Sequence, residues 1–312
     1  MVLVKKPSRC ILWGMGADYE VLLNQILFEI HKGNITVEAI VCREVDIYCN
    51  SRDGFPVISA KELKTDSFDY LIVTSNAYYR EIRQEAIGLG IEEKRIINGK
   101  VFRMTYFDFG RYQKLLENPI TILSDDCWGG GIYKSLGLPF SSPIINIAWD
   151  KNEYAEFIKD PLFYLGGELT SVQDGNLKKG IRQVCRLGNE ERYVELNFVH
   201  SLNFEEAKKE WTRRVKRINS NNLFVKMGFI SNHENKDYFI EVFNQVPYNK
   251  VLFYYGEEQI PRKLQTERFI WKEGRKGFVL DFNYSEFMRN NYYYGMDVLK
   301  LLTGEEEFSR EK

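Results

Sequence analysis

The sequence has little that would mark a membrane-spanning or secreted protein. No run approaches the roughly 20 consecutive apolar residues that a membrane-spanning helix requires. The first six residues, Met1-Val2-Leu3-Val4-Lys5-Lys6, lead directly into a polar turn instead of an apolar stretch. We therefore expect neither a transmembrane segment nor a signal peptide.

Cysteine, histidine and excess charge are also scarce. The five cysteines form no CxxC pair, which predicts reduced thiols in a cytoplasmic protein. The three histidines, His31, His200 and His233, show no ligand spacing, so we expect no structural metal, and the sequence identifies no cofactor. The formal net charge is −1 without a long block of one sign, which argues against nucleic acid or an anionic membrane as partner.

The chain has enough apolar residues and length for two domains. Its 312 residues are 44% hydrophobic and 28% charged, and one hydrophobic core rarely serves so long a chain. Short apolar runs alternate with helical patterns at first, which predicts an α/β, Rossmann-like parallel sheet domain over residues 1–112. Proline blocks helix continuation at Asn118-Pro119, and the pattern then restarts, which predicts a second, larger α/β domain over 118–312.

Periodicity and turn residues place the elements. In the first domain we expect strands at 10–13, 37–42, 68–73 and 94–97, a helix from a cap at Asp18 to Gly33, and another over 79–86. In the second we expect strands at 120–123, 193–199, 223–227, 251–255 and 278–282. Helices are expected there near 151–159, 204–218, 234–245 and 285–302.

The first strand enters a glycine turn that is typical of nucleotide-binding sites. Gly14 and Gly16 precede a helix, whose first N–H groups and dipole favour a phosphate. The third glycine of the dinucleotide fingerprint is replaced by Tyr19, and Glu44 or Asp46 is the candidate for a ribose hydroxyl. The alternative is a strand-to-helix turn that binds nothing.

The strand at 120–123 is followed by the segment that we expect to be the functional centre. It reads Ser124-Asp125-Asp126-Cys127-Trp128-Gly129-Gly130-Gly131. Glycine runs let backbone N–H groups converge on an anion, so this loop is predicted to bind a ligand phosphate through Ser124, Trp128 and the three glycines. Cys127 is either a nucleophile with a lowered pKa or a packing residue. Asp126 is a candidate catalytic residue. Asp125-Asp126 after a strand is also typical of the acidic pairs that bind a divalent metal and a sugar diphosphate, and either aspartate can instead be a helix cap.

A second group of candidates lies near residue 200. His200 ends a predicted strand, where it can be a general base or a structural histidine. On the following helix the apolar stripe leaves Arg214 at its edge and Arg217 further round. Both guanidinium groups are expected to approach a cleft, where their geometry suits phosphate or carboxylate.

Residues 9–102 resemble a recurring Rossmann-like module that is attached to bacterial surface-sugar enzymes, including sugar acyltransferases and methyltransferases. The resemblance is carried by residues 11–16, 54–58, 62–63 and 68–73. It implies a nucleotide or sugar-nucleotide pocket at Gly14, Gly16, Thr74 and Ser75.

Residues 119–302 resemble a bacterial family of domains of unknown function, number nineteen-nineteen, which is associated with exopolysaccharide or capsule synthesis. The matching segments are 122–130, Tyr133, 136–143, 198–200, 211–219 and 222–224. The family has asparagines where this chain has Asp125 and Asp126, and a tyrosine where it has Ser201. The first departure argues against an obligatory metal pair, and the resemblance implies a pathway more than a mechanism.

These observations lead to three hypotheses. The first is a transferase of surface polysaccharide assembly, with a nucleotide-sugar or acyl donor held by the glycines and Arg214 or Arg217, and with His200 as base. The second is a non-catalytic nucleotide or sugar-nucleotide binding protein that docks a polysaccharide-assembly enzyme. The third is thiol chemistry at Cys127 with His200.

Overall fold

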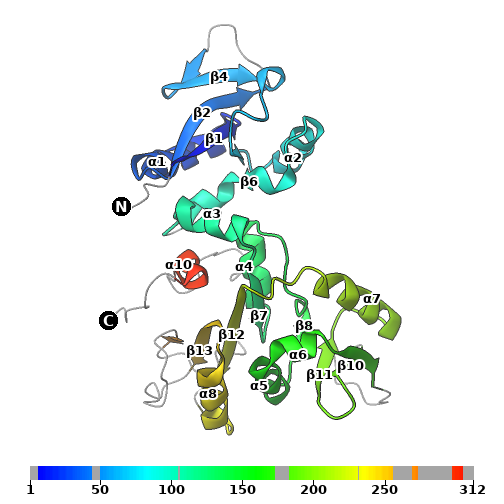
Figure 1. Ribbon diagram of the computed structural model, residues 1–312. Helices are drawn as coiled ribbons and strands as arrows, with labels where there is room; N and C mark the ends of the chain where they lie inside the picture. The colour runs from blue at the N-terminus through cyan, green and yellow to red at the C-terminus, as the bar shows by residue number, and fades with distance from the viewer. Residues whose placement is uncertain are drawn as a thin grey trace. The chain divides into compact units, whose positions relative to one another are not determined.

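The computed structural model describes residues 6–43, 50–104, 106–172, 183–230, 232–255, 269–272 and 297–304 (Figure 1). The chain divides into two compact units: Met1–Glu117 with Tyr294–Leu299, and Asn118–Tyr293 with Lys300–Lys312. Both units combine helices with a parallel sheet, so the expected mixed α/β class is confirmed. No helix in these described ranges is long and apolar enough to cross a membrane.

The first unit is built on a six-stranded sheet. Its strands are β1 (Ser8–Trp13), β2 (Ile35–Cys42), β3 (Ser51–Arg52), β4 (Phe55–Ser59), β5 (Tyr70–Val73) and β6 (Ile96–Asn98). Their order is β3-β4-β2-β1-β5-β6, and every neighbouring pair is parallel except β3 with β4. Since β2 and β5 flank β1, the strand order reverses at β1, which is where open α/β sheets bind their ligands.

Three α-helices accompany this sheet: α1 (Ala17–His31), α2 (Tyr79–Gly88) and α3 (Phe109–Glu117). The start of α1 differs from the prediction, because Gly16 and not Asp18 is its N-cap residue. The Asp18 carboxylate accepts the Asn76 N–H at 2.8 Å and pairs with Arg103. Asp18 therefore ties the helix to the chain that follows β5.

The second unit contains a four-stranded parallel sheet. Its strands are β7 (Thr121–Ser124), β12 (Leu223–Ile230), β13 (Asn249–Tyr255) and β14 (Phe269–Lys272), in the order β14-β13-β12-β7. Helices α4 (Trp128–Leu136) and α8 (Lys236–Gln245) belong to the same unit, whereas α10 (Val298–Thr303) is divided between the residues of the two units. Among the described strands β7 pairs with β12 alone and lies at one end of the strand order, and α4 starts directly beyond the carboxyl end of β7 (Figure 1).

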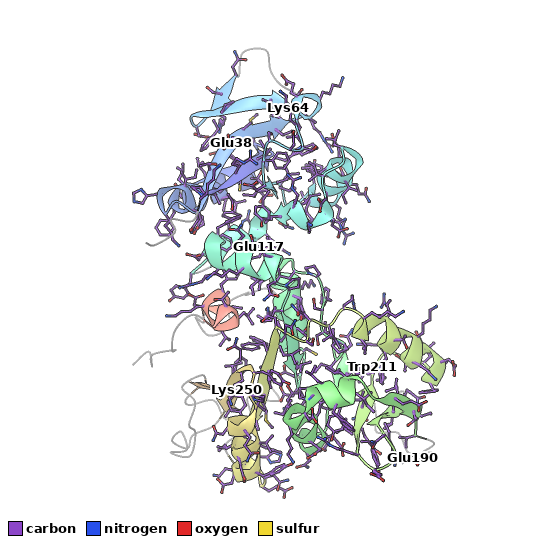
Figure 2. All side chains as sticks on the ribbon, viewed as in Figure 1. Glu38, Lys64, Glu117, Glu190, Trp211 and Lys250 are labelled. Atoms are coloured by element: carbon purple, nitrogen blue, oxygen red, sulfur yellow. The ribbon has the colours of Figure 1, made fainter. Side chains whose placement is uncertain are left out.

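A four-stranded antiparallel sheet lies between β7 and β12 in the sequence. It consists of β8 (Ile147–Ala148), β9 (Glu168–Ser171), β10 (Gln183–Gly188) and β11 (Tyr193–Phe198), in the order β8-β11-β10-β9. The accompanying helices are α5 (Lys151–Lys159), α6 (Pro161–Leu165) and α7 (Phe204–Val215). One hydrophobic cluster joins both sheets, with Val225 from β12, Leu196 from β11 and Trp211 from α7. Figure 2 labels Trp211.

Four further predictions need correction or fall outside the described residues. The three glycines at 129–131 do not form a loop, because they lie in the first turns of α4. The helix expected over 204–218 ends at Val215. The strand expected at 278–282 and most of the helix expected at 285–302 lie outside the described residues.

Candidate functional site

A small pocket with a cavity volume of about 20 Å³, open to solvent, lies beside the N-terminus of α4. Its polar lining comes from the segment between β7 and α4 and from the chain that follows α4. The lining residues are Ile122, Ser124, Asp126, Cys127, Gly129, Gly130, Ser142, Ile144, Ile145 and Asn146. The carboxyl end of a parallel strand and the start of a helix therefore meet here, as they do in many α/β binding sites.

The glycines of α4 have different physical roles. A Cβ atom at Gly129 would lie 3.1 Å from Ile122 Cγ2 and 3.2 Å from Ser124 Cβ. A Cβ atom at Gly130 would meet only Ile145 Cγ2, at an ordinary 3.5 Å. Gly129 thus lets the helix approach β7 closely, and Gly130 keeps that side of the pocket free of a side chain.

Two backbone donors remain available at this helix start. The Trp128 N–H donates to Asp126 Oδ1 at 2.9 Å, and the Gly131 N–H donates to the Cys127 carbonyl at 3.0 Å. The N–H groups of Gly129 and Gly130 find no acceptor within the described part of the chain. Free N–H groups at the positive end of a helix dipole form a ready anion site.

Ser142 adds a third unused donor. Its side chain is buried, with 1% of the residue exposed, and its Oγ has no hydrogen-bond partner among the described residues. Burying a hydroxyl group without a partner costs about 1–3 kcal/mol in proteins. A bound ligand with acceptor oxygens would remove that cost.

Asp126 lies on the pocket with most of its hydrogen-bonding capacity used. Its Oδ1 accepts the Ser124 hydroxyl at 3.0 Å as well as the Trp128 N–H, so it fixes the first turn of α4. Its Oδ2 accepts the Lys226 ammonium at 2.5 Å. The negative charge of Asp126 is therefore neutralised from inside the protein, while its side chain stays 44% exposed.

Behind the pocket lies a buried ion-pair network. The side chains of Asp125 and Lys226 are both wholly buried and meet at 2.9 Å between Oδ1 and Nζ. Asp125 Oδ2 also accepts the Gly228 N–H at 2.9 Å and pairs with Lys151. Burial alone would raise the pKa of Asp125, but Lys151 and Lys226 outweigh burial and hold that pKa below its ordinary value. The positive charges of Lys151 and Lys226 therefore balance the negative charges of Asp125 and Asp126.

Sequence patterns did not identify Lys226 and Lys151. Lys226 interrupts an apolar strand of Leu223, Phe224, Val225 and Met227, and its side chain is wholly buried. A charge inside a buried parallel strand needs a partner of opposite sign, so the lysine in this apolar run was the sequence feature that could have indicated a buried ion pair. The partners, Asp125 and Asp126, are distant in the sequence, and only the fold brings them close.

Cys127 lines the pocket without the properties of an activated nucleophile. Partial burial, followed by the Asp126 carboxylate, raises the pKa of its thiol above the ordinary value, and Lys226 offsets only part of this rise. The group is therefore a thiol at neutral pH.

Trp128 is a core residue and does not line the pocket. The centroid of its ring lies 6.2 Å from the ring centroid of Phe224 and 5.5 Å from that of Phe253. The predicted role of Trp128 in binding ligand is therefore restricted to its backbone, whose N–H is already taken by Asp126.

The structure places the other predicted residues away from the pocket lining. His200 is exposed and follows β11 of the antiparallel sheet, so it does not end a strand of the parallel sheet. Arg214 is buried, donates to the Ile145 carbonyl at 2.8 Å and pairs with Glu210 at 2.5 Å. Arg214 thus supports the Ile145 wall of the pocket from behind, and Arg217 is exposed beyond the end of α7.

At the candidate turn of the first unit, atoms of the protein itself fill the space beside Gly14. Gly14 has φ +116°, and a Cβ there would lie 2.9 Å from Thr74 Oγ1 and 3.6 Å from Ser75 Cβ. The Thr74 hydroxyl already lies within hydrogen-bonding distance of the Trp13 and Gly14 carbonyls, at 3.0 and 2.8 Å. Gly14, Thr74 and Ser75 therefore lie close together, and the nucleotide pocket that the resemblance implies there stays a prediction. Glu44 and Asp46 lie outside the described residues.

Comparison with known proteins gives two family matches and one relative. The model described as "Domain of unknown function (DUF1919)" matches residues 98–303, more than half of the chain. The model described as "C2185-like, N-terminal" matches residues 6–97. An uncharacterized protein of Haemophilus influenzae is 28% identical over 189 residues, which cover 60% of this chain and 86% of the relative.

Proposed function

The chain belongs to the family described as Domain of unknown function (DUF1919), and on that premise we propose that it is a transferase with a phosphate-bearing donor. The donor is a nucleotide sugar or an acyl donor, and the pathway is surface polysaccharide assembly. The observation that carries this proposal is the pair of free N–H groups, at Gly129 and Gly130, that begin α4 on the wall of an open pocket.

The charges around the pocket support a phosphate there. A carboxylate such as Asp126 would by itself repel an anion at the same helix start. Lys226, paired with Asp126 at 2.5 Å, cancels that repulsion from within the core. The donor phosphate then gains from the helix dipole and from two backbone N–H groups that need no reorganisation during the reaction.

We assign the role of base to Asp126 and no longer to His200. Asp126 lines the pocket and is partly exposed, whereas His200 is not among the pocket residues. The acceptor oxygen forms a bond to the sugar or acyl carbon, the bond from that carbon to the leaving group of the donor breaks, and the hydroxyl proton passes to Asp126. A positioned base contributes about 10²- to 10⁴-fold to the rate.

The proposal is tested by measuring transfer from a panel of nucleotide sugars and acyl donors to polysaccharide precursors. Asp126→Asn is expected to lower the rate by about 10²- to 10⁴-fold. The control Asp150→Asn changes an exposed aspartate that caps α5 outside the pocket lining, and it is expected to retain full transfer. Equal transfer by both folded variants would contradict the assignment.

A second candidate is a non-catalytic nucleotide or sugar-nucleotide binding protein that docks a polysaccharide-assembly enzyme. The observation in its favour is the strand order, which reverses at β1 beside Gly14 and Gly16. That order supports a Rossmann-like first unit with a nucleotide near Thr74 and Ser75.

Two matched substitutions separate the candidates. Gly130→Asp and Gly16→Asp each place a carboxylate at a helix start, where it favours the helix but repels a phosphate. Neither site has a tight Cβ contact, since Gly16 meets nothing within 4 Å and Gly130 meets an atom at 3.5 Å. Loss of nucleotide binding only in Gly130→Asp supports the transferase. Loss only in Gly16→Asp supports the sensor.

A further inference from the structure

We infer that the pocket beside α4 recognises the phosphate part of its ligand and not a nucleotide base, with Ser142 as the third donor to that phosphate. The inference rests on the proposed function, because it names the part of the donor that this site selects. Ser142 was not among the residues that the sequence predicted.

Ser142 is the spare hydroxyl of the pocket. Two serines line it, and the Ser124 hydroxyl already donates to Asp126 Oδ1 at 3.0 Å. Ser142 is 1% exposed, and its hydroxyl has no hydrogen-bond partner in the described part of the chain. With the N–H groups of Gly129 and Gly130 it completes a set of three unused donors. Such a set fits the several acceptor oxygens of a phosphate group.

The size and lining of the pocket argue against a base in the same place. The cavity volume of about 20 Å³ is far below the roughly 300–1,000 Å³ of pockets that enclose a drug-sized ligand. None of the described residues that line it is aromatic, so none offers the ring on which a nucleobase would stack. A nucleoside attached to the phosphate therefore extends out of the pocket and adds no selectivity there.

The inference also predicts a stability effect that is independent of activity. Ser142→Ala removes a buried hydroxyl that has no hydrogen-bond partner among the described residues, so no hydrogen bond is lost. Its thermal midpoint is expected to equal or exceed that of the wild type. Ser141→Ala is the matched control, because Ser141 is also buried but its hydroxyl donates to the Pro139 carbonyl at 3.4 Å.

Binding is measured on the full chain by titration calorimetry with inorganic phosphate, pyrophosphate, UDP, GDP and CDP. We expect pyrophosphate and the three nucleoside diphosphates to bind with affinities within about threefold of one another, because they share the recognised group. Ser142→Ala is expected to weaken each by roughly 10- to 100-fold, as for a hydrogen bond to a charged group. Ser141→Ala is expected to bind like the wild type.

Three results would overturn the inference. The first is that Ser142→Ala and the wild type bind pyrophosphate with equal affinity. The second is that a nucleoside diphosphate binds more than about tenfold better than pyrophosphate. The third is that Ser142→Ala has a lower thermal midpoint than the wild type. If the wild type catalyses transfer and Ser142→Ala binds the ligands normally, the proposed function stands and this inference fails. Ser142-dependent pyrophosphate binding without any transfer would support the inference and contradict the proposed function.

Discussion

The connection between β1 and α1 and the connection between β7 and α4 are built from similar parts but differ in what surrounds the free N–H groups at the start of the helix. Each joins a buried parallel strand to a helix, with glycines in the connection itself at the first (Gly14, Gly16) and in the first turns of the helix at the second (Gly129–Gly131). At the first, the Thr74 hydroxyl faces the Gly14 carbonyl, and Asp18 accepts the Asn76 N–H. In the described ranges, N–H groups without an acceptor begin both helices, at Gly16, Ala17 and Asp18 in α1 and at Gly129 and Gly130 in α4. At the second, a pocket with the unbonded Ser142 hydroxyl lies beside them.

Glycines and free N–H groups at a helix start are therefore weaker evidence for a binding site than the same groups beside a pocket. What distinguishes the second turn is a pocket with unused donors and a carboxylate whose charge is cancelled from the core. Substitutions at both turns can break or sharpen that distinction, beginning with the largest expected effect.

The buried charges behind the second turn are expected to matter most. Asp125→Ala leaves Lys226 wholly buried with one carboxylate fewer, so it should lower the free energy of unfolding by about 3–5 kcal/mol. Asp18→Ala at the first turn removes a partly exposed pair with Arg103 and should lower it by no more than about 1 kcal/mol. Urea unfolding of both variants measures the difference, and similar losses would refute it.

The contribution of Asp125 is expected to depend on pH with a definite sign. Its folded pKa lies below the ordinary value despite burial, because of Lys151 and Lys226. Its stabilisation is therefore fully present above the unfolded pKa of about 3.9 and is lost as the pH falls through the lower folded value. The stability difference between wild type and Asp125→Asn should stay constant from about pH 7 to about 5 and shrink below about pH 4. A difference that grows on acidification would contradict this account.

Within the first turn, Gly14 and Gly16 should respond differently to alanine. Gly14 has a φ of +116° and no space for a Cβ beside Thr74 Oγ1, so Gly14→Ala should cost about 1–3 kcal/mol. A Cβ atom at Gly16 would meet nothing within 4 Å, and Gly16→Ala should change stability by about 0.5 kcal/mol or less. Chemical unfolding measures the stability of both variants, and equal losses of unfolding free energy would contradict this explanation.

The smallest expected difference lies within α4. Gly129→Ala adds a methyl group at 3.1–3.2 Å from β7 side chains, whereas Gly130→Ala adds one at 3.5 Å from Ile145. Because alanine favours a helix over glycine by up to about 1 kcal/mol, Gly130→Ala should be at least as stable as the wild type. Gly129→Ala should be less stable than Gly130→Ala by about 1 kcal/mol. The reverse order in thermal unfolding would show that Gly129 is not required for packing.

Local pattern predicted much of the fold, since apolar runs and helical spacing are properties of short segments. The strand expected at 120–123 is β7, and the helix expected at 151–159 is α5 with the same bounds. The antiparallel sheet was not predicted, because strand pairing depends on contacts between distant segments. The strand expected at 193–199 pairs with β10 and β8, and nothing in its own residues specifies these partners.

The position of the candidate site was predicted better than its chemistry. Glycine content and the end of a strand indicated 124–131, where the pocket lies. The helical state of the glycines was missed, because the contact of Gly129 with Ile122 is tertiary. Periodicity placed Arg214 near a cleft but did not reveal that Glu210 and the Ile145 carbonyl occupy its guanidinium group.

The central claim is that the start of α4, and not the start of α1, binds phosphate. Protein labelled with ¹⁵N only at its 23 glycines allows both turns to be followed in one titration with pyrophosphate. The account predicts that the amide signals of Gly129 and Gly130 shift in a saturable way, while those of Gly14 and Gly16 stay in place. Saturable shifts at Gly14 and Gly16 without shifts at Gly129 and Gly130 would contradict it.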